Sequence, residues 1–220
     1  MASKILTSSQ QNFIALLAQN KYFKDSFYLT GGTALAAYYL HHRHSEDLDF
    51  FCLKQIDILG LDAFLKEIKT ALKIKKSDFQ QSFNRNIFFL HTKEEILKVE
   101  FTYFPFEQIE KPIRKDGILI DSIVDIATNK TFTIFQNPRA RDFIDLYFIL
   151  EKCKELLLPK LSKLARSKFD SQIDPIQLGT QLLKAKEIRD LPRMVKKINH
   201  QQWREFFTNQ AKSLSNQIFK

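Results

Sequence analysis

The chain has 220 residues, 44% hydrophobic and 27% charged, which is typical of a globular protein with one large domain or two small ones. No apolar run is long enough to span a bilayer and the first residues lack the apolar core of a secretory signal, so we expect a cytoplasmic protein without membrane contact. The net charge of +9 lies entirely in residues 126–220, which carry 18 Lys and Arg against 9 Asp and Glu; this asymmetry indicates a polyanionic partner or a basic surface that only aids solubility.

The first half of the chain alternates between helical and strand patterns. Thr7-Ser8-Ser9 can cap a first helix, in which apolar residues recur at helical spacing. Residues 33–41 and 61–72 are also predicted to be helical. Strand patterns occupy a further set of ranges: 26–30, 47–53, 78–83, 86–91 and 96–104. These elements predict a mixed sheet flanked by helices.

The second half is helical in pattern. A helical region begins at Asp121, after the turn residues Asp116-Gly117, and continues with proline-marked breaks to the carboxyl end. We therefore expect an α+β protein with a mixed-sheet domain over residues 1–120 and a basic, all-helical domain over residues 121–220.

Two aspartates alternate in the strand predicted over residues 47–53. Successive strand side chains point to opposite faces, so Asp47 and Asp49 share one face while Leu48 and Phe50 point into a core. Two carboxylates this close repel each other unless a cation lies between them or water screens both. Mg²⁺ prefers oxygen ligands of this kind. The pair is thus a candidate metal site, with an acidic solvent-facing strand as the alternative.

The strand predicted over residues 96–104 supplies a third carboxylate. Its alternation places Glu100 on the face of Lys98 and Thr102, opposite the apolar face. If this strand lies beside the 47–53 strand, Glu100 joins Asp47 and Asp49, completes a two-metal site and can accept a proton from an attacking hydroxyl.

Gly31-Gly32-Thr33 stands between a predicted strand and a predicted helix. Glycine lets the backbone approach a ligand closely, and the helix start offers free N–H groups to phosphates. A simple turn is the alternative. Glycines holding a triphosphate beside carboxylates holding a metal would suit nucleotidyl transfer, in which an acceptor hydroxyl attacks the α-phosphorus and pyrophosphate leaves.

These residues also form a recognisable pattern. The stretch over residues 31–51 resembles the AbiEii/AbiGii-type toxin family, which belongs to the DNA polymerase β-like nucleotidyltransferase superfamily. The matching residues are Gly31-Gly32-Thr33-Ala-Leu and then His42-Arg43-x-Ser45-x-Asp47-x-Asp49-Phe-Phe. A later stretch, Ala127-Thr-Asn-Lys130 and then Arg141-Asp142-Phe-Ile-Asp145-Leu-Tyr147, looks like the helical motif of that family. The resemblance covers about residues 28–150, and it implies that the domain expected over residues 1–120 is a catalytic domain of the nucleotidyltransferase fold.

The resemblance implies a role for each matching residue. Asp47, Asp49 and Glu100 would be the catalytic ligands of Mg²⁺ or Mn²⁺, and Lys130 would contact the nucleotide phosphates. The other candidate nucleotide-binding residues are Gly31, Gly32, Thr33, Arg43, Ser45 and Arg139. Asp142 and Asp145 would support the active site or brace the domain, together with Arg141, which could also pair with Asp145 one helical turn away.

Two positions depart from the family pattern. The third acidic residue is commonly Asp and is here Glu100, which is one methylene longer. An arginine often follows the motif lysine by seven residues, and here that position is Asn137, for which Arg139 is the candidate substitute. The clustered histidines 41, 42 and 44 are expected to cap a helix end rather than to bind metal.

The resemblance implies a transferase of toxin–antitoxin systems that moves NMP from an NTP to an acceptor hydroxyl, with a cognate antitoxin as a candidate partner. The resemblance implies tRNA as a candidate acceptor, and the basic second half favours RNA over protein; there Arg189, Arg193, Lys196 and Lys197 are spaced to share a helical face. The alternatives are nucleotidylation of a protein hydroxyl and a non-catalytic module that binds an antitoxin.

Overall fold

The computed structural model describes residues 5–218 and, for side chains, residues 5–214. The chain divides into two compact units, which are described separately. One contains the chain up to Tyr39, His44–Glu107 and Lys111–Ser122; the other contains Leu40–Arg43, Gln108–Glu110 and the chain from Ile123 onward. None of the helices within residues 5–218 is both long and apolar enough to cross a bilayer.

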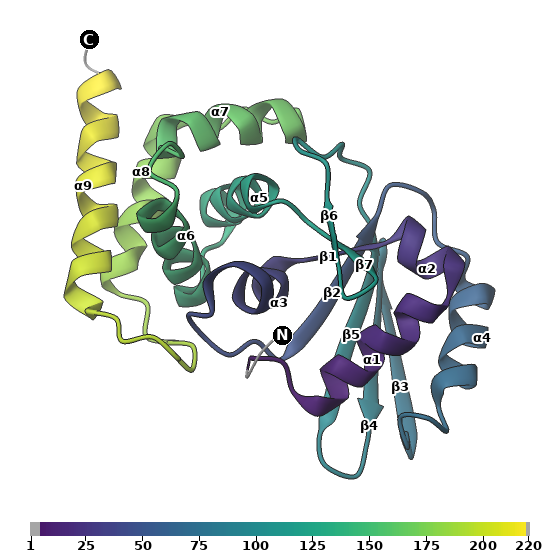
Figure 1. The fold of residues 1–220 in the computed structure, drawn as a ribbon. Coiled ribbons are helices and arrows are strands. Elements are labelled where there is room, and N and C mark those ends of the chain that lie inside the picture. The colour runs from purple at the N-terminus through teal and green to yellow at the C-terminus, as the bar shows by residue number, and fades with distance from the viewer. Residues whose placement is uncertain (1–4, 219–220) are drawn as a thin grey trace. The chain divides into compact units, whose positions relative to one another are not determined.

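The first unit is built on a mixed sheet, for which the described residues supply seven strands in the order β3-β4-β5-β2-β1-β7-β6 (Figure 1). The strands are β1 (Tyr28–Thr30), β2 (Asp47–Cys52), β3 (Lys76–Ser82), β4 (Arg85–His91), β5 (Ile96–Tyr103), β6 (Ile113–Lys115) and β7 (Ile118–Ile120). In the centre, β2 runs parallel to β5 and antiparallel to β1.

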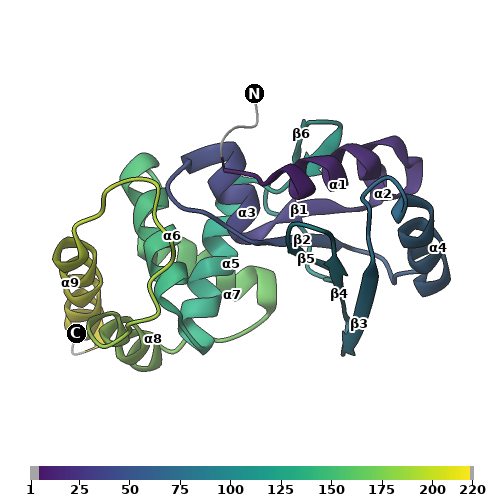
Figure 2. The same ribbon diagram turned by 90° about the horizontal axis from the view of Figure 1, so that it is seen from below.

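Helices α1 (Ser8–Gln19), α2 (Lys21–Ser26) and α4 (Ile58–Ile68) gather on one face of this sheet (Figure 2). Aromatic side chains fill the layer between them. The ring of Phe13 lies 6.1 Å from that of Phe50, and the ring of Phe27 lies 5.3 Å from that of Phe101. Burying such rings on one side explains why β2 alternates between buried and half-exposed residues, and it leaves the polar side chains of β2 on the opposite face.

The second unit is helical. It contains α5 (Ile123–Gln136), α6 (Ala140–Lys152), α7 (Leu158–Phe169), α8 (Pro175–Leu183), a short 3₁₀ turn (Lys184–Lys186) and α9 (His200–Ile218). Its core includes Phe143 of α6, whose ring lies 5.0 Å from that of Phe207 of α9. The fold class predicted from the sequence is therefore confirmed: a mixed sheet with helices, followed by the helical region α5–α9.

Several element boundaries differ from the prediction. The helix expected over residues 33–41 begins at Gly31 as α3 (Gly31–Leu35) and continues as a π-helical turn over Ala36–Leu40. The helix expected over residues 61–72 begins at Ile58, because the Asp57 carboxylate caps it by accepting a hydrogen bond from the backbone N–H of Leu59.

Two further regions differ from the prediction. The turn at Asp116-Gly117, with φ of +50° and +80°, joins β6 to β7, two strands that were not expected, and the following helix starts at Ile123, two residues after Asp121. The segment over residues 188–199 is not helical. Pro192 interrupts it, and the N–H groups of Val195 and Lys196 donate to the carbonyl of His42 instead of to a helical turn. The basic residues of this segment therefore do not share a helical face.

Candidate functional site

The central strands bring the predicted carboxylates together. The parallel register of β2 and β5 pairs Asp47 with Lys98 and Asp49 with Glu100. Because side chains alternate along a strand, these four residues lie on one face, opposite the aromatic core. The geometry that the sequence analysis required for Glu100 is thus present in the sheet.

Two cations neutralise this face. The Lys98 ammonium lies 2.8 Å from Asp47 Oδ2. The Arg85 guanidinium donates two hydrogen bonds of 2.6 Å to the two oxygens of Glu100, and the Thr102 hydroxyl donates a third of 2.7 Å. Burial alone would raise the pKa of Glu100, but these hydrogen bonds and the nearby positive charges hold the pKa below its ordinary value. Glu100 is therefore ionised at neutral pH.

The donor set fits a hard divalent cation in chemistry and in its placement on one rigid face. Asp47 and Asp49 offer carboxylate oxygens beside each other, and Glu100 is in register with Asp49. In this structure, however, the oxygens of Glu100 accept hydrogen bonds from Arg85 and Thr102. Over residues 5–214, no three His, Cys, Asp or Glu side chains converge closely enough to hold an ion. A metal ion and Arg85 would thus compete for Glu100.

Gly31 links the glycine turn to the carboxylates. Its φ is +69°, which lies in the left-handed region, and a Cβ on Gly31 would lie 2.9 Å from Asp49 Oδ2. Both facts require glycine here. The need for a side-chain-free residue therefore comes at least in part from Asp49 itself, and not only from a phosphate that would approach the turn.

The remaining predicted residues of the first unit have different surroundings. The buried Thr33 hydroxyl donates to the backbone carbonyl of Asp47, so it fixes the start of β2. Ser45 lies in the loop before β2, where its carbonyl accepts a 2.9 Å hydrogen bond from Gln10. Gly32 is half-buried at the start of α3, where Thr30 contributes no side-chain cap.

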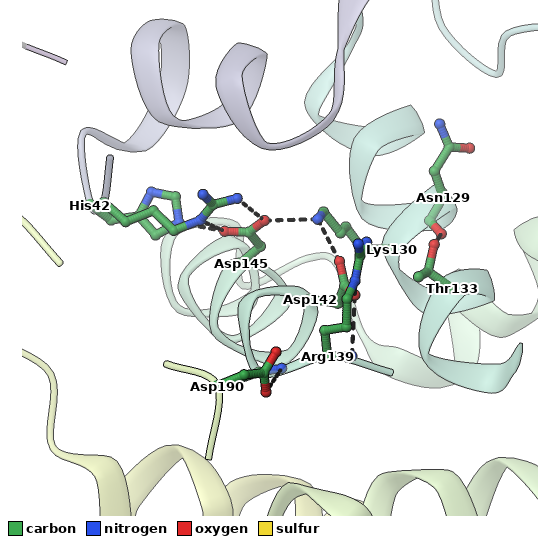
Figure 3. A network of polar contacts seen from close by, with 10 residues as sticks. His42, Asn129, Lys130, Thr133, Arg139, Asp142, Asp145 and Asp190 are labelled. Carbon is green, nitrogen blue, oxygen red and sulfur yellow. Dashed lines mark hydrogen bonds and ion pairs between the residues drawn. The ribbon is translucent and has the colours of Figure 1, made fainter. Parts of the chain in front are cut away.

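The second motif forms a buried network of charges within the helical unit (Figure 3). Asp145 accepts hydrogen bonds from Arg43 Nε at 2.6 Å and from the other arm of that guanidinium at 2.8 Å. Lys130 Nζ lies 2.9 Å from Asp145 and 2.7 Å from Asp142. His42 Nε2 is 2.8 Å from Asp145. Lys130 thus bridges the two carboxylates, and His42 and Arg43 hold Asp145.

Arg139 closes the other end of this network. Its Nε donates to Asp142 Oδ2 at 3.1 Å, and its side chain is 48% exposed, whereas that of Lys130 is 10% exposed. Asp190 Oδ1 accepts a 3.3 Å hydrogen bond from the N–H of Ala140, which places the 188–199 segment against the start of α6 (Figure 3). Arg139 is thus the more accessible cation of the two.

Two local expectations are corrected by this network. Asp145 pairs with Arg43 and Lys130 rather than with Arg141 one turn away, because α6 turns Asp145 into the buried side of the unit. His42 is fully buried against Asp145 and the ring of Phe148 and does not cap a helix end in solvent.

The charges of the network shift the pKa values of its members. Burial alone would raise the pKa of Asp145, but Lys130 and Arg43 hold it well below its ordinary value. The pKa of Asp142 is lowered in the same way, against its burial, by Lys130 and Arg139. Burial lowers the pKa of His42, against the attraction of Asp145. The carboxylates of the network are therefore charged at neutral pH.

The predicted residues form two clusters, one in each unit. Gly31, Gly32, Thr33, Ser45, Asp47, Asp49 and Glu100 belong to the first unit, and Arg43, Lys130, Arg139, Arg141, Asp142 and Asp145 to the second. Two features of these clusters were not predicted from the sequence: Arg85, which lies between two of the predicted strands, and the contact of His42 with Asp145. The pairing of neighbouring strands could have suggested Arg85, whereas nothing local in the sequence points to the partner of His42.

A mixed sheet carrying two alternating aspartates and an adjacent glutamate on one face, beside a glycine turn, defines the class of nucleotidyltransferase-fold proteins. The family model "Nucleotidyl transferase AbiEii toxin, Type IV TA system" matches residues 15–217, and the chain belongs to this family of nucleotidyltransferase toxins of type IV toxin–antitoxin systems. The resemblance stated from the motifs is thereby confirmed.

Three other proteins are similar to this chain. The chain is 32% identical to protein aq_aa25 of Aquifex aeolicus over 149 aligned residues. The alignment covers 66% of this chain and 67% of that protein. The crystal structure of a Helicobacter pylori protein proposed to be a nucleotidyltransferase has a TM-score of 0.63 at 21% identity, covering 96% of this chain and 97% of the other. That of JHP933 from H. pylori has a TM-score of 0.61 at 22% identity, covering 95% and 90%. These two likenesses show the same fold.

Gly31→Ala should destabilise the first unit. The left-handed backbone costs about 1–2 kcal/mol for a residue with a Cβ, and the new methyl group must also displace the carboxylate of Asp49. Urea denaturation of Gly31→Ala, Asp49→Ala and the double variant would measure this. We expect the effect of Gly31→Ala to be smaller when Asp49 is already alanine; equal effects in both backgrounds would contradict the contact.

Asp145→Asn should lower the free energy of unfolding at pH 7 by about 3–5 kcal/mol, because it leaves Lys130 and Arg43 buried with less compensating charge. The pKa of Asp145 is depressed in the folded chain, so its stabilisation is fully present above its unfolded pKa of about 3.9 and is lost as the pH falls toward the folded pKa. Unfolding measured from pH 7 to pH 2 should therefore show a smaller acid dependence in Asp145→Asn than in the unaltered chain. An unchanged dependence would contradict this assignment.

Proposed function

We propose that the chain transfers a nucleoside monophosphate from an NTP to a hydroxyl of RNA, with Mg²⁺ or Mn²⁺ as cofactor. The observation that carries this proposal is the register of β2 and β5, which sets Asp49 beside Glu100 on the face of Asp47, with Gly31 packed against Asp49. Membership of a nucleotidyltransferase family supports the reaction class. The RNA acceptor and the metal are the parts that experiment must test.

In this proposal each residue of the first unit has a distinct task. Asp47 and Asp49, with Glu100, hold the metal, which when bound neutralises the phosphates and the attacking oxygen. Glu100 accepts the proton of the acceptor hydroxyl, for which its ionised state at neutral pH is required. The N–H groups at the start of α3, from Gly31-Gly32-Thr33, bind the phosphates, with Ser45 nearby in the loop before β2.

The residues of the second unit contribute positive charge and support. Lys130 and Arg139 contact the phosphates, and Arg139 supplies the accessible charge that Asn137 does not. Arg43 contributes to nucleotide binding through the segment that it anchors on Asp145. Asp142 and Asp145 hold these cations in place, and Arg141 supports the start of α6. The network thus positions cations rather than reacting itself.

The positive charge of the second half of the chain supports RNA as the acceptor. The excess of nine positive charges lies in residues 126–220, and Arg189, Arg193, Lys196 and Lys197 are all exposed on the 188–199 segment. A phosphate backbone attracts such a surface without requiring a helix. Nucleotidylation of a protein is the second candidate, because an acidic protein could meet the same charges. We place the reaction in the cytoplasm, where NTPs and tRNA are available, with a cognate antitoxin opposing it.

One experiment separates the acceptors. The chain would be incubated with each α-³²P-labelled NTP, Mg²⁺ or Mn²⁺, total cellular RNA and total protein, and the products would be divided by nuclease and protease digestion before electrophoresis. Label in a nuclease-sensitive band supports the proposal, and label in a protease-sensitive band favours the second candidate. No transfer with any NTP would refute both.

Asp49→Ala should abolish transfer while the fold remains intact, because it removes a metal ligand from a face where carboxylates repel one another. Glu100→Gln should slow transfer by about 10²–10⁴-fold if Glu100 accepts the proton. Initial rates, circular dichroism and Mn²⁺ binding would be measured for both variants. Transfer retained by Asp49→Ala would rule out the metal site, and equal losses of Mn²⁺ affinity in the two variants would make Glu100 a ligand only.

Replacing Arg193, Lys196 and Lys197 together by alanine should weaken RNA binding and leave NTP binding nearly unchanged. If the chain neutralises about four phosphates of a flexible RNA, the log–log dependence of affinity on salt should have a slope near −3, and the triple variant should flatten it. Fluorescence anisotropy with labelled RNA would measure this slope at salt concentrations from about 50 to about 300 mM, over which affinities of this kind change strongly. A slope that the three substitutions do not change would place the RNA elsewhere.

A further inference from the structure

The turn between β3 and β4 presents one aromatic ring to solvent. Phe83 follows the last residue of β3, and 98% of its surface is exposed, more than for any other large apolar residue described over residues 5–214. Its φ is +51°, in the left-handed region. Phe83 is thus unusual both in its exposure and in its backbone conformation.

Neither property stabilises the fold. A bulky residue in the left-handed region is strained, and two-residue hairpin turns usually have Asn, Asp or Gly at such a position. An exposed ring also loses the burial that makes an aromatic residue favourable. Since Asn or Gly would suit this turn better, the reason for a phenylalanine has to be sought in what it contacts outside the chain.

The turn is close to the carboxylate face. The carbonyl of Asn84 accepts a 3.0 Å hydrogen bond from the N–H of Tyr103, and Arg85 is opposite Thr102 in the β4–β5 register. Glu100 is two residues further along β5, roughly 7 Å at the usual rise of a strand. Arg85 reaches across this distance to Glu100, with half of its own side chain exposed. The turn that carries Phe83 thus lies beside the carboxyl end of β5, one of the two strands that carry the candidate site.

The chemistry of the hairpin favours a nucleobase. Residues 79–91 contain no Asp or Glu but include an arginine, and the exposed amide residues Gln80, Gln81 and Asn84 lie next to Phe83 in the sequence. A flat ring stacks on any base, amides can bond to base edges, and an arginine attracts the phosphates. A protein partner or a second copy would need an apolar surface far larger than one ring at a turn.

We propose that Phe83 is a stacking site for a base of the single-stranded RNA acceptor, next to the nucleotide that reacts at the carboxylate face. This inference rests on the proposed function, because it names the part of the chain that receives the RNA near the site. Binding at Phe83 would depend on a base that stacks on the ring, whereas binding at the basic 188–199 segment would depend on phosphates alone.

The test compares Phe83 variants in RNA binding without catalysis. The affinity of each variant would be measured by fluorescence anisotropy of a labelled, short single-stranded RNA and of the same strand with abasic positions. Phe83→Ala should weaken binding of the intact strand by about 5- to 150-fold, the range that base stacking contributes per base, while Phe83→Trp should restore it. Both variants should bind the abasic strand equally. NTP binding should be unchanged in both.

Two controls separate recognition from folding. Phe83→Gly should keep or raise the melting temperature, because glycine accepts the left-handed backbone, yet should weaken RNA binding as Phe83→Ala does. Leu59→Ala removes a side chain that is 82% exposed on α4, on the face of the sheet away from the carboxylates, and should leave RNA binding unchanged.

Three outcomes would overturn the inference. If the unaltered chain binds RNA and Phe83→Ala binds it equally well, the ring is not a stacking site, although the proposed RNA acceptor stands. If the unaltered chain binds no RNA, the RNA acceptor and this inference fall together. If Phe83→Ala changes the oligomeric state in sedimentation and RNA binding only follows that change, the ring is a contact between copies.

Discussion

Carboxylates of like charge that are held close together on rigid elements need cations beside them, and this requirement organises both halves of the chain. In the sheet, Asp47 and Glu100 are paired with Lys98 and Arg85. In the helical unit, Asp142 and Asp145 share Lys130, and Arg43 completes the neutralisation. Each cation comes from a different strand, turn or helix than the carboxylate it neutralises, so the charge balance also ties the elements of each unit together.

The two groups of charges differ in what they can do. On the sheet, Arg85, Lys98 and Asp47 are partly open to solvent, so their ionic contacts are screened and can be exchanged for a metal ion or a phosphate. Glu100 itself is buried, so an incoming ion would have to replace the charge of Arg85. The network around Asp145 is buried, so removing one member would leave an uncompensated charge away from water. The exchangeable pairs suit a reacting site, whereas the buried network suits a fixed support for Lys130 and Arg139.

The carboxylate face could be predicted from the sequence because strand alternation is local and has a period of two. The spacing of Asp47 and Asp49 and the position of Glu100 within its strand determined their faces, and only the adjacency of the two strands had to be assumed.

Arg85 could not be assigned in this way, because its partner lies fifteen positions away on a neighbouring strand. Two partners of Asp145, His42 and Arg43, come from a segment about a hundred residues earlier, and local spacing suggested Arg141 instead. The helical face expected across residues 189–197 failed for two reasons: Pro192, which the sequence shows, interrupts a helix there, and the distant carbonyl of His42, which the sequence does not reveal as a partner, accepts the N–H groups of Val195 and Lys196.

The glycine turn shows how closely fold and chemistry are joined in this chain. Its first residue has no side chain because the carboxylate of Asp49 occupies the space, and its third fixes the backbone of Asp47 through a hydroxyl. The turn therefore positions both aspartates directly, whatever it binds. A phosphate held by the N–H groups of the same turn would lie next to those aspartates without any further adjustment of the backbone. A short segment that would contact the substrate thus also sets the geometry of the residues that would hold its metal, which explains why glycines and carboxylates lie so near each other in the sequence.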